Sequence, residues 1–69
     1  MELYTINVGD TIYTVNRIDA EFYIMEGLVQ LTTLTYEQDK WLSSVLTLSP
    51  SLTLKLGEAI DHYYASQTL

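Results

Sequence analysis

Hydrophobic and polar residues alternate along residues 2–18, which is the pattern of paired, half-buried β-strands. Gly9 and Asp10 interrupt the alternation and suit a two-residue type II′ turn, because glycine readily takes the positive φ that the first turn position requires. The residues paired by this turn are Val8 with Thr11, Ile6 with Tyr13, and Tyr4 with Val15. All but Thr11 are apolar, so the sequence predicts a hairpin with one buried face.

Residues 21–31 form a second apolar stretch, which fits either a hairpin or a helix. As a hairpin it turns at Glu26 and Gly27, and as a helix it begins at a cap on Asp19. The residues paired in the hairpin are Ile24 with Val29 and Phe22 with Leu31. Aromatic and β-branched side chains, together with the central glycine, favour the hairpin.

Residues 34–48 have the pattern of an amphipathic helix whose start is encoded in the sequence. Thr35 fits the N-cap, and Gln38 lies three residues later, where it completes a capping box. Apolar side chains then recur at helical spacing, at Trp41, Leu42, Val45 and Leu46. We therefore expect a helix here, with the single tryptophan on its buried face.

A second helix is predicted after Pro50, which suits the first helical position with Ser49 as its cap. Its apolar side consists of Leu52, Leu56, Ala59, Ile60 and Tyr63. Gly57 weakens the isolated helix but allows a neighbouring element to approach closely. The predicted fold is a single α+β domain, residues 1–69, in which an antiparallel β-sheet of two hairpins is followed by two α-helices packed on one face.

Composition narrows the range of functions. Nine acidic residues outnumber three basic ones, for a net charge of −6, so direct binding to nucleic acid or to an anionic membrane is not expected. A larger protein with a basic surface is the partner that this charge favours. The chain has no cysteine, no signal-peptide pattern and no apolar run long enough to span a membrane, so a cytoplasmic location is expected.

Residues capable of catalysis are few. His62 is the only imidazole, and Glu58 lies four residues earlier on the same face of the predicted helix. Two ligands without a third do not make a metal site. No phosphate-binding loop, nucleophile elbow or zinc-protease motif is present. We therefore expect a protein that is not an enzyme, with no catalytic residue, cofactor or metal.

Tyrosine is the more informative residue type, because six of the eight aromatic residues are tyrosines. Tyrosine is favoured at protein interfaces, where it offers a large rigid ring with a polar tip. Exposed tyrosines next to carboxylates suit contact with a basic protein. The predicted partner-binding residues are Glu21, Tyr23, Glu26, Tyr36, Glu37, Asp39, Glu58, Asp61 and Tyr64.

In size, acidity and lack of cysteine, the whole chain resembles small phage-encoded host-takeover proteins, anti-CRISPR proteins among them. This resemblance implies an inhibitor or modulator that binds a nucleic-acid-binding host protein, such as a CRISPR effector, in the host cytoplasm. Its carboxylates would take the place of nucleic-acid phosphates.

A second resemblance covers residues 22–46, where an extended stretch precedes a capped apolar helix. Its pattern is carried by Leu34, Thr35, Gln38 and Leu42, and it is similar to the start of phage tail-assembly chaperones. It implies the alternative function, a virion structural or tail-assembly component that acts through self-association as a homo-oligomer.

Overall fold

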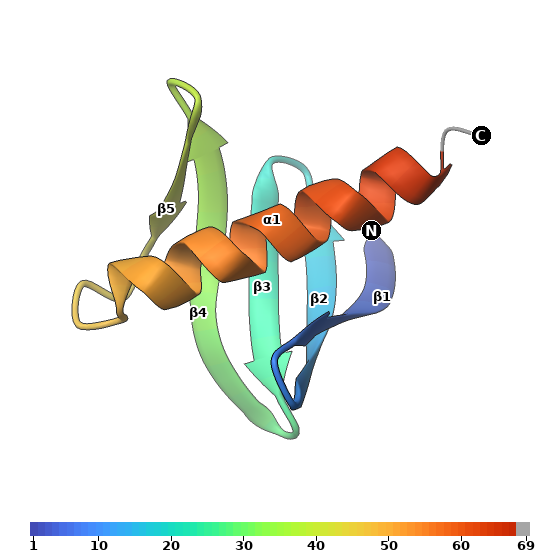
Figure 1. The fold of residues 1–69 in the computed structure, drawn as a ribbon, viewed down its shortest axis with the longest axis horizontal. Helices are drawn as coiled ribbons and strands as arrows, with labels where there is room; N and C mark the ends of the chain where they lie inside the picture. The colour runs from blue at the N-terminus through green and yellow to red at the C-terminus, as the bar shows by residue number, and fades with distance from the viewer. Residues whose placement is uncertain (68–69) are drawn as a thin grey trace.

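Five antiparallel strands follow one another along the chain and lie in the sheet in that same order (Figure 1). The computed structural model describes residues 1–67, and the strands in this part are β1 (Glu2–Val8), β2 (Thr11–Ile18), β3 (Glu21–Glu26), β4 (Val29–Glu37) and β5 (Lys40–Ser43). A single helix in the same residues, α1 (Pro50–Gln67), crosses one face of the sheet. The fold class is therefore α+β, but the predicted arrangement of two hairpins followed by two helices is wrong, because residues 34–48 contribute to β4 and β5 and only α1 follows the sheet within residues 1–67.

The first hairpin has the predicted register. Seven consecutive residue pairs join β1 to β2, from Glu2 with Arg17 to Val8 with Thr11. Of the two turn residues only Gly9 has a positive φ, of 61°, as a type II′ turn requires. The prediction is confirmed because a two-residue turn and an alternating pattern together fix the register locally.

Residues 21–31 are strands, as favoured, but the predicted pairing is wrong. The turn lies at Gly27 and Leu28, one residue later than expected, with Gly27 at a φ of 62°. The pairing also shifts register between Ile24 and Met25. The observed partners are Leu34 for Phe22 and Thr32 for Ile24, in place of Leu31 and Val29. This shift allows Leu34 to face the core, where it is completely buried.

The helix predicted over residues 34–48 is wrong. Strand β4 continues to Glu37, the chain reverses at Gln38 and Asp39, and β5 begins at Lys40. Both turn residues have positive φ, of 53° and 63°, which is the conformation of a type I′ hairpin turn. The two-residue alternation through β4 therefore prevails over the capping-box pattern, because it buries Leu34 against the other strands.

Helix α1 begins as predicted. The Ser49 hydroxyl accepts a hydrogen bond from the Leu52 N–H at 3.4 Å, and the Ser49 carbonyl accepts one from the Thr53 N–H at 3.0 Å. The buried residues of the helix are Thr53, Leu56, Gly57 and Ile60. From the predicted apolar side, Leu56 and Ile60 are buried, while Leu52, Ala59 and Tyr63 pack against the edge of the core.

The core lies between α1 and the face of the sheet that α1 covers. Its buried hydrophobic residues are Tyr4, Ile6, Tyr13, Val15, Phe22, Ile24, Leu34, Leu56 and Ile60. The outer face of the sheet is not covered by any part of residues 1–67, and several of its apolar side chains are exposed. These are Leu3, Ile12, Ile18 and Leu42. No helix in residues 1–67 combines the length and apolar character that a membrane span needs.

Candidate functional site

Four aromatic side chains surround a surface hollow between α1 and the sheet, which we call the aromatic hollow. It has a volume of about 310 Å³. The residues that line it are Arg17, Ala20, Phe22, Tyr36, Trp41, Ile60, Asp61 and Tyr64. The strands β2 to β5 and the second half of α1 all contribute to it, so it exists only once the helix has packed on the sheet.

Trp41 forms one side of the aromatic hollow and is held by several contacts. Its indole N–H donates to the Asp61 carboxylate, with 3.3 Å between Nε1 and Oδ2. Its ring lies 5.3 Å from that of Phe22, edge to face, and 5.1 Å from that of Tyr36. Tyr36 is directly opposite Trp41 in the sheet and remains half exposed. The hollow therefore presents a fixed aromatic pair beside an exposed carboxylate.

Arg17 forms the other side. Its guanidinium carbon lies 5.2 Å from the centre of the Phe22 ring and 5.3 Å from that of Tyr64, within the range of cation–π attraction. Its Nε donates to the backbone carbonyl of Asp19 at 3.2 Å. The Tyr64 hydroxyl in turn donates to the Glu2 carboxylate at 2.8 Å. One of the three basic side chains of the chain is thus fixed on aromatic rings.

A tyrosine cluster beneath this region ties α1 to β1. Tyr4 stacks on Tyr63, with ring centres 3.8 Å apart, and meets Tyr64 edge to face at 5.6 Å. The Tyr4 hydroxyl is buried and has no hydrogen-bond partner among residues 1–67. Burial, with a smaller contribution from Tyr64, raises the pKa of Tyr4 well above its usual value. Tyr4 is therefore neutral and structural at physiological pH.

The predicted partner-binding residues do not form one surface. Tyr36, Asp61 and Tyr64 come together in the aromatic hollow, and the exposed Glu37 and Asp39 lie at the β4–β5 turn next to Tyr36. Arg17, Phe22 and Trp41 also line the hollow but were not predicted as site residues, since Phe22 was expected in a hairpin and Trp41 in a helix.

The other four predicted residues lie elsewhere. Glu21 and Tyr23 are on the outer face of the sheet, where the Tyr23 hydroxyl donates to the Glu21 carboxylate at 3.4 Å. Glu26 lies at the β3–β4 turn. Glu58 is exposed on α1 and contributes to a different depression.

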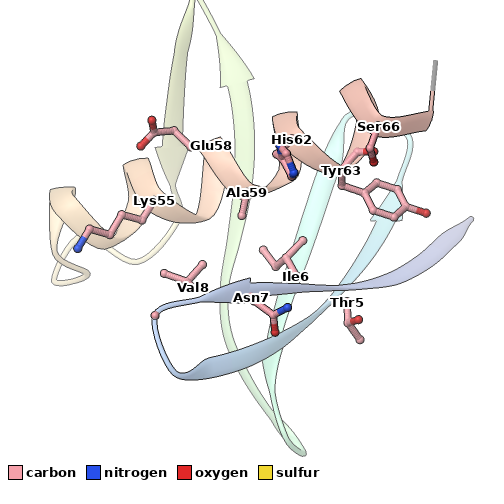
Figure 2. Close-up of a pocket in the computed structure, with 11 residues that line it drawn as sticks. Thr5, Ile6, Asn7, Val8, Lys55, Glu58, Ala59, His62, Tyr63 and Ser66 are labelled. Carbon is pink, nitrogen blue, oxygen red and sulfur yellow. The ribbon is translucent and has the colours of Figure 1, made fainter. Parts of the chain in front are cut away.

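That depression, which we call the β1 groove, runs between α1 and the outermost strand of the sheet and has a volume of about 630 Å³ (Figure 2). Its lining includes Thr5, Ile6, Asn7, Val8 and Gly9 from the first hairpin and Lys55, Glu58, Ala59, His62, Tyr63 and Ser66 from α1. Figure 2 shows Ile6 and Val8 pointing toward α1 and Thr5 and Asn7 pointing away from it. His62 is exposed, and residues 1–67 contain no group of three potential metal ligands.

Comparison with known proteins provides no relative for this chain. No protein-family model matches it, and neither a curated protein nor a solved structure is detectably similar to it.

Proposed function

We propose that this protein is a non-catalytic interaction protein that binds a basic surface on a larger protein partner through the aromatic hollow. The observation that carries the proposal is the ring pair of the half-exposed Tyr36 and the partly buried Trp41, fixed beside the Asp61 carboxylate. Aromatic side chains of this kind contribute most of the binding energy at many interfaces, because they offer large rigid areas.

The chemistry of the aromatic hollow favours a lysine or arginine side chain from the partner. Such a side chain can lie on the Tyr36 or Trp41 ring and reach the Asp61 carboxylate, combining cation–π attraction with an ion pair. Arg17 already makes such cation–π contacts with Phe22 and Tyr64 in the same hollow. Glu37 and Asp39, both exposed, add negative charge at the adjoining turn.

The net charge of −6 supports a partner that itself binds nucleic acid, since such proteins carry the basic surfaces that this chain would be attracted to. We propose a phage-encoded protein acting in the host cytoplasm, which inhibits or modulates a host protein such as a CRISPR effector. The acidic residues are spread over several regions instead of forming a continuous row, so the proposal depends more on the aromatic hollow than on phosphate mimicry.

A matched set of variants tests this function. Purified CRISPR effectors and other basic host proteins are titrated with the wild type, with Tyr36→Ala and with Asp61→Asn. We expect each substitution to weaken binding at least about tenfold, which corresponds to the loss of one interface anchor. The control Glu26→Gln removes the same charge as Asp61→Asn but lies outside the hollow, and it should bind like the wild type.

Two results would refute the proposal. Equal losses for Asp61→Asn and Glu26→Gln would show that only overall charge matters. An affinity that does not fall as the salt concentration rises would exclude recognition of a basic surface.

The alternative function, self-association in a virion or tail assembly, is favoured by a different observation. The uncovered outer face of the sheet carries Leu3 and Ile12, which are 69% and 64% exposed. Exposed apolar patches of this kind often mark interaction sites. Light scattering distinguishes the two functions: a ring or larger oligomer supports assembly, whereas a monomer or dimer supports the inhibitor.

A further inference from the structure

Strand β1 is a long sheet edge without the usual protection against further pairing. It pairs with β2 over seven residues without a register shift, and Glu2 is its only charged residue. It contains neither lysine nor proline, and natural sheet edges commonly carry one of these or a bulge. The opposite edge, β5, is four residues long and begins with a lysine. Of the two edges of the sheet, β1 is therefore the one suited to pairing.

The register identifies which backbone groups point outward from this edge. In a two-residue hairpin the residues that flank the turn, here Val8 and Thr11, form a hydrogen-bonded pair, and such pairs recur at every second residue. The N–H and C=O groups of Leu3, Thr5 and Asn7 therefore point away from β2, toward the open side of the strand. These three N–H donors and three C=O acceptors recur at every second residue, which is the spacing that an added strand needs for hydrogen bonding.

The β1 groove lies along this edge and has α1 as its second wall (Figure 2). Polar side chains with helical spacing face it from α1, namely Lys55, Glu58, His62 and Ser66. A strand placed along β1 would form main-chain hydrogen bonds on one side and meet these side chains on the other. Such an arrangement is typical of peptide binding by strand addition.

We propose that the β1 groove binds an extended segment of another protein that carries basic side chains, and that this segment pairs with β1 as a sixth strand. The proposal goes beyond the function proposed above, since no residue that lines the aromatic hollow lines the groove. A second copy of the chain is the less suitable occupant, because two copies of net charge −6 repel each other. Lys55 lies near Gly9, so the basic side chains of the segment are expected toward Glu58.

The experiment uses short synthetic peptides of alternating threonine, valine and lysine, which favour the extended state. Two controls accompany them: the same peptide methylated on alternate backbone nitrogens, which cannot pair along that edge, and a version with glutamate in place of lysine. Binding to the full chain is followed by two-dimensional NMR of the backbone amides. We expect the lysine peptide to shift the amides of Leu3, Thr5 and Asn7, and we expect the methylated peptide to leave them unchanged.

A pair of protein variants provides the matching control on the other side of the interface. Thr5→Pro removes an outward N–H without breaking a bond to β2, whereas Thr5→Ala keeps that N–H and removes only the side chain. We expect Thr5→Ala to bind like the wild type and Thr5→Pro to lose at least about tenfold in affinity, as the loss of a main-chain hydrogen bond and of strand geometry implies. Circular dichroism confirms that both variants are folded.

Several outcomes would overturn the proposal. The absence of shifts at the three amides with all peptides at millimolar concentration would exclude strand addition. Shifts at Tyr36 or Trp41 instead would assign the peptide to the aromatic hollow and leave the function proposed above intact. A dimer of the wild type that Thr5→Pro dissociates would show that the occupant is a second copy.

Discussion

The indole ring of Trp41 lies directly against Gly57, in the space that the Cβ of any other residue would occupy. A Cβ built on Gly57 would overlap the Trp41 ring, with its Nε1 only 2.6 Å away. Strand β5 therefore approaches α1 as closely as the backbone of the helix allows, and this contact places Trp41 within reach of Asp61. A glycine that is unfavourable for an isolated helix is required here by tertiary packing.

Gly57→Ala should therefore destabilise the protein, although alanine is the better helix former. The substitution gains about 1 kcal/mol of helix propensity, but displacing a packed indole ring costs about 1–3 kcal/mol and also disturbs the Trp41–Asp61 hydrogen bond. We expect a lower midpoint in urea unfolding. Glu58→Ala, at the exposed neighbouring position, should change stability by less than about 0.5 kcal/mol.

A double variant checks the cause of this effect. If the overlap with the indole ring is responsible, the double variant Gly57→Ala with Trp41→Leu should lose less free energy of unfolding than the sum of the losses in the two single variants. If the two single losses in the free energy of unfolding simply add in the double variant, the overlap of the Trp41 ring with the new methyl group is not the cause.

The β4–β5 turn provides a test of local conformation. Gln38 and Asp39 both have positive φ, which asparagine and glycine adopt more readily. The double substitution Gln38→Asn with Asp39→Gly should raise the free energy of unfolding by about 0.5–1 kcal/mol. In a helix over residues 34–48 the same glycine would cost about 1 kcal/mol, so the sign of the change in thermal unfolding distinguishes the two conformations.

Truncation to alanine should affect stability strongly at Leu34 and hardly at all at Leu46. Leu34 is completely buried, so Leu34→Ala should cost about 2–5 kcal/mol, which is most of the stability of a domain of this size. Leu46 is 96% exposed, and Leu46→Ala should stay within about 0.5 kcal/mol of the wild type. Denaturant unfolding measures both. A large loss for Leu46→Ala would contradict its position outside the core.

Tyr4 should make the protein sensitive to alkali. The fold holds the pKa of Tyr4 above its unfolded value of about 10, so the unfolded chain loses this proton first. The stability that depends on neutral Tyr4 is therefore fully present below pH of about 10 and decreases as the pH rises above that value. Urea unfolding at a series of pH values should show a smaller alkaline loss for Tyr4→Phe than for the wild type.

Tyr4→Phe also has an expected effect at neutral pH. Because the buried hydroxyl has no partner among residues 1–67, its removal should leave stability unchanged or raise it by up to about 1 kcal/mol. The control is Tyr36→Phe, at a half-exposed ring, which should change stability at neutral pH by less than about 0.5 kcal/mol. A loss of stability in Tyr4→Phe at neutral pH would show that the hydroxyl is hydrogen-bonded after all.

The parts of the fold that were predicted correctly are those encoded by neighbouring residues. The first hairpin follows from alternation around Gly9, and the start of α1 follows from Ser49 and Pro50. Residues 34–48 match two local patterns equally well, a capping box at Thr35 and a strand that ends in a polar turn. The burial of Leu34 against the other strands and the contact of Trp41 with Gly57 favour the second pattern, and single-sequence periodicity does not contain these distant contacts.

Only part of the candidate site was predicted, because the rest also depends on distant contacts. Tyr36, Asp61 and Tyr64 were identified as exposed residues of an interface type, but their proximity depends on how α1 packs across the sheet. Arg17 was missed because a single basic residue in an acidic chain gives no local signal of the rings on which it stacks. The close approach that Gly57 permits was the one indication in the sequence of what faces α1.

The order of the strands has a consequence for how the chain reaches this structure. Every strand pairs with its neighbours in sequence, so the sheet can form by closing short loops, which is fast for a β-rich protein. Joining Tyr64 to Glu2, by contrast, closes a loop that spans almost the whole chain. We therefore expect the C-terminal end of the helix to dock on β1 after the meander has formed, and the apolar face of the meander to stay open to aggregation until then.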